Sequence, residues 1–161
     1  MTPTIRKAIS GDGPGIHDSH MRSIREVCMA DHGANEVSGW GNRPYGDYWE
    51  TSIVNKSVHL WVVEYDGKIE GHAGIRIKDP QRASVFGLYL TPIVLGKGLG
   101  KQLLSLMISA AQREGVACIT LESTITAHQF YMKNGFVDTN TIQTGTIGGS
   151  SVRYFPMKFT L

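Results

Sequence analysis

Hydrophobic and polar positions follow two different periods along this chain. In several short stretches apolar residues alternate with polar ones, which is typical of half-buried strands. Elsewhere apolar residues recur every three to four positions, which is typical of helices. The helical period is clearest where leucines, a methionine and alanines mark one face between Gly98 and Gly115. This pattern predicts a long amphipathic helix that ends at a glycine cap.

The first part of the chain predicts one strand and two helices. The strand covers residues 4–9, the first helix runs from Ile16 to about Gly33, and the second covers residues 46–54. Between the helices, residues 40–45 are rich in glycine and aromatic side chains. This segment either packs the joint between the helices or forms a loop that faces a substrate.

The middle of the chain predicts a hairpin. Asp66 and Gly67 separate the alternating stretches 58–64 and 69–77, and Asp-Gly is a preferred hairpin turn. The remaining expected elements are a strand over residues 84–90, the long helix, a strand over residues 116–121, a helix over residues 127–134, and two strands around Gly148 and Gly149. The order predicts one α/β domain over residues 1–161, built on a mixed sheet.

Composition supports a globular domain and excludes several functions. The chain has 161 residues, of which 41% are hydrophobic and 19% charged, and its net charge is +2. This charge is too small to indicate nucleic-acid binding, and no apolar stretch is long enough for a membrane span. Residues 1–12 lack the apolar middle of a secretory signal. Cys28 and Cys118 have no metal-binding spacing, so we expect reduced thiols in a cytoplasmic protein and no metal site.

A glycine loop lies between a strand and the long helix. Residues 90–102 read LTPIVLGKGLGKQ. Glycines allow close ligand approach, and the free amides of a first helical turn attract anions, so a phosphate could bind here. The spacing fits neither the Walker loop nor the GxGxxG dinucleotide fingerprint. Taken alone, the glycines could equally well shape a strand-to-helix turn.

A second motif follows downstream: residues 127–136 read AHQFYMKNGF, and place Phe130 and Tyr131 on a short helix closed by Gly135. With both motifs in this order, the chain resembles the GNAT-type N-acetyltransferases. That superfamily has a [QR]xxGx[GA] loop before its third helix and an FY helix ending in x[KR]xGF. The resemblance extends over essentially the whole chain. Two positions depart from it: Leu95 stands where Gln or Arg is usual, and Thr124 where Asn is common.

The resemblance implies a fold and an activity. The mixed sheet would split between its fourth and fifth strands and be flanked by helices. Acetyl-CoA would bind in the split, and an acceptor amine of a small molecule or peptide would attack the thioester directly. Many relatives form homodimers. The residues that the resemblance assigns to cofactor binding are Leu88, Tyr89, Leu90, Leu95, Gly96, Lys97, Gly98, Leu99, Gly100, Lys101, Thr124 and Phe130.

Within this set, backbone amides of residues 95–101 would hold the pyrophosphate. Residues 88–90, locally bulged, would pair with the pantetheine arm, and the N–H of Leu88 or Leu90 would stabilise charge on the thioester oxygen. Tyr131 occupies the place of the usual general acid.

The sequence offers two candidates for the general base. The family often places a Glu early in the fourth strand, and here the equivalent is Ser84. His72, in the third strand, ranks first as a replacement, and Glu122, at the end of the fifth, is the alternative. The missing acid leaves a second hypothesis open, a catalytically silent CoA-binding sensor or interaction module. A third hypothesis is an enzyme that binds another phosphate ligand, such as a nucleotide.

Overall fold

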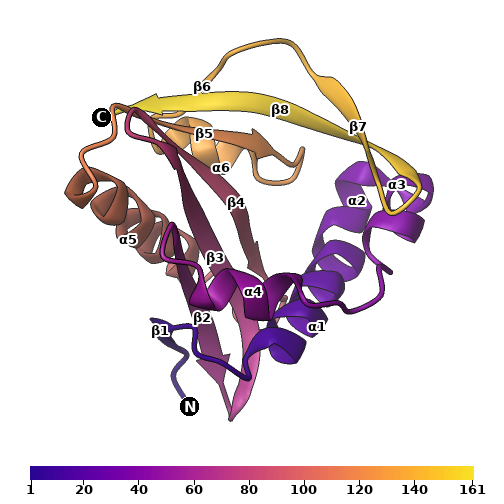
Figure 1. Cartoon of the computed structure of the whole chain (residues 1–161). Helices are drawn as coiled ribbons and strands as arrows, with labels where there is room; N and C mark the ends of the chain where they lie inside the picture. The colour runs from indigo at the N-terminus through magenta and orange to yellow at the C-terminus, as the bar shows by residue number, and fades with distance from the viewer.

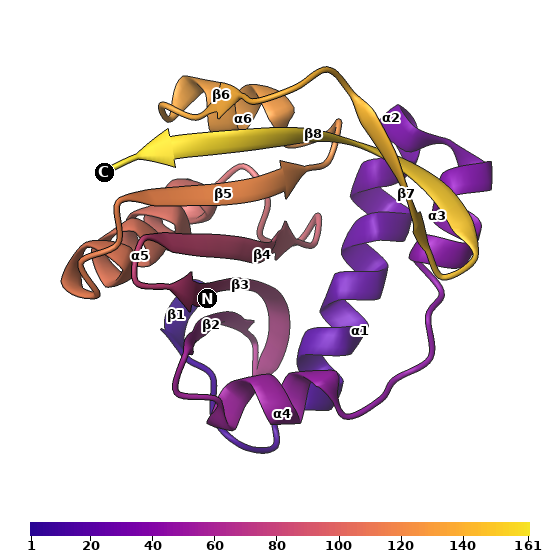
Figure 2. The same cartoon turned by 45° about the horizontal axis from the view of Figure 1, so that its top comes forward.

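The computed structural model describes residues 1–161 as one mixed sheet with helices on both faces (Figures 1 and 2). The strands are β1 (Thr4–Lys7), β2 (Val58–Tyr65), β3 (Lys68–Asp79), β4 (Arg82–Leu90), β5 (Cys118–Ser123), β6 (Val137–Asp138), β7 (Gln143–Ile147) and β8 (Ser150–Thr160). The helices are α1 (Gly13–Ser23), η1 (Ile24–Cys28, a π-helical turn), α2 (Met29–His32), α3 (Ala34–Trp40), α4 (Tyr48–Val54), α5 (Leu99–Arg113) and α6 (His128–Lys133).

The strand order is β1-β2-β3-β4-β5-β8-β6, with β7 paired to the other end of β8. All neighbours are antiparallel except β4 and β5, which are parallel. A parallel pair needs a crossover, and the long helix α5 supplies it. This mixed α/β sheet is the fold class that the sequence predicts.

Helix α5 covers one face of the sheet and carries the main core. Its buried stripe, which includes Leu103, Met107 and Ala110, packs with Ile75 of β3 and Val85 of β4. These positions recur at three and four residues, so a single helical face is removed from water. The amphipathic helix predicted between Gly98 and Gly115 is confirmed.

Helices α1 and α4 cover part of the opposite face, next to β2, β3 and β4 (Figure 2). The predicted helix from Ile16 to about Gly33 starts earlier, at Gly13, and contains the π-helical turn η1. It does end at Gly33, whose φ of 82° interrupts the helix. Helix α3 was not predicted. The segment 40–45, which was expected to join two helices, begins at the last residue of α3. None of the helices is long and apolar enough to cross a membrane.

Candidate functional site

Strands β4 and β5 separate soon after they begin. Their parallel pairing starts at Arg82 and ends at Val85, which lies opposite Leu121. Beyond that point β5 is paired only with β8, while β4 continues to Leu90 (Figure 1). The sheet is therefore open between its fourth and fifth strands, as the resemblance implies.

A β-bulge distorts β4 at Phe86. Its neighbours Val85 and Gly87 pair with consecutive residues of β3, so Phe86 has no partner there. The Phe86 ring lies against Gly74, where any side chain would clash with it. The bulge was expected over residues 88–90, but these three pair regularly with β3, so that expectation is wrong. The distortion instead lies directly after Val85, the last residue of β4 that pairs with β5, and so at the start of the opening.

The backbone N–H groups of Leu88 and Leu90 point into the opening. In an antiparallel pair, successive residues direct their N–H and C=O groups alternately toward and away from the neighbouring strand. The N–H of Thr91 donates to the carbonyl of Glu70 on β3, so the preceding Leu90 faces the other way. Accordingly, the Leu90 carbonyl accepts a hydrogen bond of 2.8 Å from the Ser23 hydroxyl of α1.

Two cavities meet at the opening. The larger, of about 530 Å³, lies between β4 and β5 and is lined by Tyr131 and Glu122 among others. The smaller, of about 310 Å³, lies between the end of β4 and the start of α5. Leu88, Tyr89 and Thr124 line both cavities. An extended ligand held in the smaller cavity can thus present one end to the larger.

The turn before α5 has amide groups that no backbone carbonyl accepts. Gly96 and Gly98 have φ values of 77° and 80°, a conformation that favours glycine. No backbone hydrogen bond uses the N–H groups of residues 96–101, which lie at the positive end of the helix dipole. The N–H of Leu95, by contrast, donates to Thr91 at 3.0 Å. The free amides therefore begin one residue later than the anion site predicted over residues 95–101.

The residues expected to bind the cofactor gather around the smaller cavity with one exception. Lys101 and Phe130 line it, whereas Lys97 is exposed and lies outside its lining. Thr124 also lines it, but its hydroxyl oxygen accepts a hydrogen bond of 3.0 Å from the Ala127 N–H. Thr124 therefore supports the turn before α6 as well as facing the cavity.

The Tyr131 side chain, on α6, forms part of the wall of the larger cavity. Its side chain is largely buried, with 4% of the residue exposed, and packs edge-on against Phe130 and Phe136. No group of the chain hydrogen-bonds to its hydroxyl. Burial raises the pKa of Tyr131. The phenol therefore keeps its proton at neutral pH and remains a hydrogen-bond donor.

His72 does not reach either cavity. It is fully buried, in aromatic contact with His20, Trp49 and Tyr89. Neither ring nitrogen has a hydrogen-bond partner, and burial lowers the pKa of His72 to about 3. The prediction that His72 turns toward the cleft as a base is therefore wrong: the side chain faces the layer under α1 and α4.

Glu122, the alternative base, does line the larger cavity. Its side chain is exposed there, and it forms neither an ion pair nor a hydrogen bond within the chain. Ser84, which replaces the family's usual acid, lines the same cavity. The two side chains lie on one face of the sheet, because Ser84 pairs with Thr120, two residues before Glu122. Glu122 is the carboxylate that the cavity offers.

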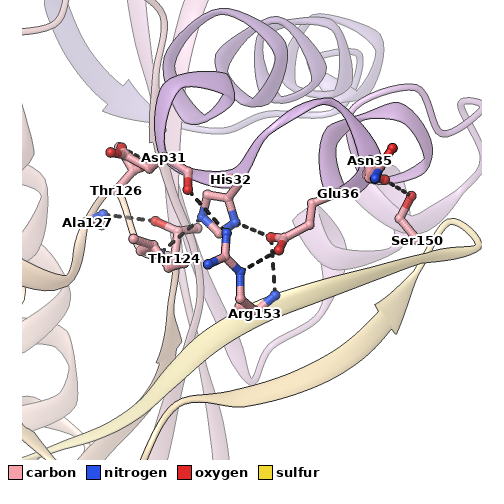
Figure 3. Close-up of polar contacts among 10 residues, drawn as sticks. Asp31, His32, Asn35, Glu36, Thr124, Thr126, Ala127, Ser150 and Arg153 are labelled. Atoms are coloured by element: carbon pink, nitrogen blue, oxygen red, sulfur yellow. Dashed lines mark hydrogen bonds and ion pairs between the residues drawn. The ribbon is translucent and has the colours of Figure 1, made fainter.

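A polar network holds the loop between β5 and α6 (Figure 3). The Ile125 N–H donates to His32 Nε2 at 3.1 Å, and His32 Nδ1 lies 2.6 Å from a Glu36 oxygen. Arg153 of β8 donates to the other oxygen of Glu36. The Thr126 hydroxyl donates to Asp31 at 2.8 Å. Sequence reasoning missed His32, because its partner Ile125 lies 93 residues downstream and no local motif marks the pair.

Comparisons with known proteins agree with this geometry. Residues 28–161 match the family described as the acetyltransferase (GNAT) domain. An uncharacterized N-acetyltransferase of Escherichia coli K12, YjgM, is 28% identical over 127 residues, which cover 76% of this chain and 73% of that protein.

Two solved structures show the same fold over the whole chain. A GCN5-related N-acetyltransferase from Rhodopseudomonas palustris has a TM-score of 0.79 at 20% identity and covers 100% of this chain and 97% of its own. The PaiA N-acetyltransferase from Thermoplasma acidophilum, in complex with coenzyme A, has a TM-score of 0.79 at 22% identity and covers 100% of both chains. Together with the family match, the split sheet and the glycine turn lead to one conclusion: this chain belongs to the GNAT acetyltransferase family.

Proposed function

We propose that this protein is an acetyl-CoA-dependent N-acetyltransferase in which an acceptor amine attacks the thioester directly. The observation that carries the proposal is the meeting of the two cavities at Leu88 and Tyr89. One cavity has the free amides of a phosphate-binding turn, and the other has a carboxylate and a buried phenol. A donor and an acceptor could therefore approach the same short stretch of β4 from opposite sides.

The smaller cavity fits the donor. The N–H groups of residues 96–101 would hold the pyrophosphate, with the ammonium of Lys101 adding charge. The exposed edge of residues 88–90 would hydrogen-bond to the pantetheine arm, because no strand occupies it. Acetyl-CoA bound in this way would supply an activated acetyl group at the junction of the cavities.

The N–H groups of Leu88 and Leu90 would stabilise negative charge as it develops on the thioester oxygen. They are fixed by the pairing of β4 with β3, so they need no reorganisation during the reaction. One such preorganised donor is worth roughly 3 kcal/mol of barrier in acyl transfer.

Two side chains are placed to handle protons. An alkyl ammonium must lose a proton before it can attack, and Glu122 is the carboxylate in the acceptor cavity. We assign Glu122 as the proton acceptor, directly or through water. Tyr131, kept protonated by burial, would donate to the sulfur of the departing CoA.

The assay is thiol release from acetyl-CoA with a panel of amines, using wild type, Tyr131→Phe and Phe130→Leu. We expect Tyr131→Phe to lower kcat by about 10- to 100-fold with unchanged CoA affinity. Phe130→Leu, on the other cavity, should weaken CoA binding instead. An unchanged kcat in Tyr131→Phe would remove this residue from the mechanism.

A CoA-binding sensor is the second candidate function, and Ser84 is the observation that favours it. A serine in the place of the family's acid cannot act as a general base. A sensor would bind CoA in a calorimetric titration yet release no thiol with any acceptor. Any thiol release by the wild-type protein that Glu122→Gln slows strongly, with unchanged CoA affinity, favours the enzyme over the sensor.

A further inference from the structure

Arg43 carries a positive charge that no carboxylate of the chain neutralises. It lies in the segment between α3 and α4 and is half-buried. Its Nε donates to the Trp40 carbonyl at 2.9 Å, but neither terminal nitrogen has a partner within the chain. Arg6, Arg22 and Arg153, by comparison, all pair with carboxylates. A partly desolvated guanidinium without a counter-ion is costly, and burial lowers the pKa of Arg43.

The side chain of Arg43 is held beside the larger cavity. Its stem packs against the turn after β7, where a Cβ at Gly148 would lie 3.0 Å from Arg43 Cγ. The preceding residue, Ile147, lines the cavity. The backbone carbonyl of Arg43 is fixed by a 2.9 Å hydrogen bond with His17 Nε2.

The cavity itself contains a single charged side chain. Glu122 is the one carboxylate among its lining residues, which include no lysine, arginine or histidine, and burial keeps Tyr89 and Tyr131 protonated. The charge inside is therefore negative, and the charge of Arg43 at its edge is positive. An acceptor with an ammonium at one end and an anionic group at the other would complement both.

We propose that the acceptor is an amine that also carries a carboxylate or phosphate, and that the guanidinium of Arg43 binds this anionic group. The inference rests on the proposed acetyltransferase function, since it names the acceptor of that site. An arginine fork presents two parallel N–H donors to either group, and the two terminal nitrogens of Arg43 are free to do so. The ammonium end then lies toward Glu122 and the Leu88 backbone.

Two other cations near the cavity define the alternatives. Arg76 lies 5.1 Å over the Phe86 ring, has no ion-pair partner, and its Nε is buried without a hydrogen bond. Lys158 is exposed and pairs with Thr120 across the β5–β8 ladder. Like Arg43, neither is among the residues that line the cavity. Arg43 is favoured because its Nε is anchored on the Trp40 carbonyl while both terminal nitrogens stay free, whereas the charge of Arg76 lies over the Phe86 ring and that of Lys158 is solvated.

The test uses acceptors in matched pairs that differ only in the anionic group. The pairs are phenylalanine with 2-phenylethylamine, and O-phosphoethanolamine with ethanolamine, so the result also separates carboxylate from phosphate. At saturating acetyl-CoA, we expect kcat/KM for the anionic member of one pair to exceed that of its neutral twin at least tenfold. Arg43→Gln should abolish this preference while changing kcat/KM for the neutral twin by less than about twofold.

Matched variants make the outcome specific to Arg43. Arg43→Lys should retain part of the preference, because it keeps the charge and loses the fork. Arg113→Gln removes the same charge from the exposed end of α5 and should leave the preference intact. Loss of the preference in Arg76→Gln or Lys158→Gln, with retention in Arg43→Gln, would overturn the assignment. So would measurable but equal rates of acetylation within both pairs.

A binding measurement separates this inference from the proposed function. CoA-loaded protein is titrated calorimetrically with the same four compounds. Tighter binding of an anionic member, lost in Arg43→Gln, supports the anion site even if no thiol is released, in which case the proposed catalysis fails alone. Equal or weaker binding of both anionic members by wild-type protein overturns the inference, whatever the assay shows.

Discussion

The backbone N–H of Ile125 donates to Nε2 of His32 across 3.1 Å, and this bond fixes which ring nitrogen is protonated. A backbone N–H can only donate, so Nε2 must be the acceptor and Nδ1 must carry the hydrogen that reaches Glu36. His32 has no exposed side-chain surface. It therefore links α2 and α3 to the loop whose residues Thr124 and Thr126 face the smaller cavity.

Replacing His32 tests this link. His32→Leu leaves the Ile125 N–H without an acceptor and should destabilise the fold by about 2–3 kcal/mol, as for a lost buried hydrogen bond and its unpaired partner. It should also weaken CoA binding, because the loop loses its anchor. His32→Gln can restore the acceptor near the position of Nε2, and His32→Asn the donor near Nδ1. If CoA affinity recovers in His32→Gln but not in His32→Asn, the hydrogen bond to Ile125 is the important one. Equal CoA affinity in His32→Leu and wild type would contradict the link.

The turn before α5 gives a second prediction. Gly98 has a φ of 80° and Gly115, at the far end of the same helix, has a φ of 74°, and a Cβ at either position would meet no other atom. Alanine at either site should therefore cost about 1 kcal/mol of backbone strain. Only Gly98→Ala should weaken CoA binding, since it alone displaces the amides of residues 96–101. Urea unfolding and CoA titration of both variants measure the two effects separately.

Much of this fold could be predicted from patterns of residues that are close together in the sequence. The stripe on α5, the Asp66–Gly67 hairpin and the glycine caps each depend on neighbours a few residues away, and all appear in the structure. Helix α3 could not be predicted in this way, because residues 34–40 contain glycine and serine and bury only Val37 and Trp40. Two buried positions are too few to mark a helical period.

The residues of the candidate site also fall into those that local sequence predicts and those that it does not. The glycine turn and the FY helix are contiguous in sequence, so their residues could be named in advance. The placement of His72 could not, because alternation assigns a strand residue to a face but not to what covers that face. Here α1 and α4 cover it with His20 and Trp49. Arg43 likewise becomes informative only when the chain is seen to supply no carboxylate beside it.

The buried histidines predict a specific pH dependence of stability. An unfolded histidine has a pKa near 6.5, whereas burial lowers that of His72 to about 3 and that of His20 well below its usual value. Between these limits the unfolded chain binds more protons than the folded one. The contribution of these histidines to the free energy of unfolding should therefore be complete above pH 6.5. It should fall toward pH 3, by up to about 1.4 kcal/mol per pH unit for each histidine.

His72→Leu should reduce the slope of the unfolding free energy against pH by the contribution of one histidine. Urea unfolding of wild type and variant between pH 4.5 and 7.5 measures it, and carboxylates that titrate at the acidic end affect both proteins alike. Parallel stability curves for wild type and His72→Leu would show that His72 is protonated in the folded state after all.

Glu70 connects the sheet to the start of the turn before α5. This buried carboxylate, 2% exposed, accepts hydrogen bonds from Arg22 at 2.8 Å and from the Thr91 hydroxyl at 2.6 Å. Thr91 in turn accepts the N–H groups of Val94 and Leu95, which shape the turn. Glu70→Gln should cost about 2–4 kcal/mol, less than the full loss of a buried pair because Arg22 keeps its bond to Asp18.

Thr91→Val separates the two connections of Glu70. It removes only the hydroxyl hydrogen bond and should cost about 1–2 kcal/mol, while leaving the ion pair with Arg22 in place. Because the Thr91 carbonyl still accepts its two amides, CoA affinity should change little in Thr91→Val. In Glu70→Gln it should fall further, because Arg22 also loses its ion pair, and the neighbouring Ser23 holds the Leu90 carbonyl at the end of β4. Equal CoA affinities in the two variants, measured at a temperature where both are folded, would show that Glu70 supports the sheet and not the turn.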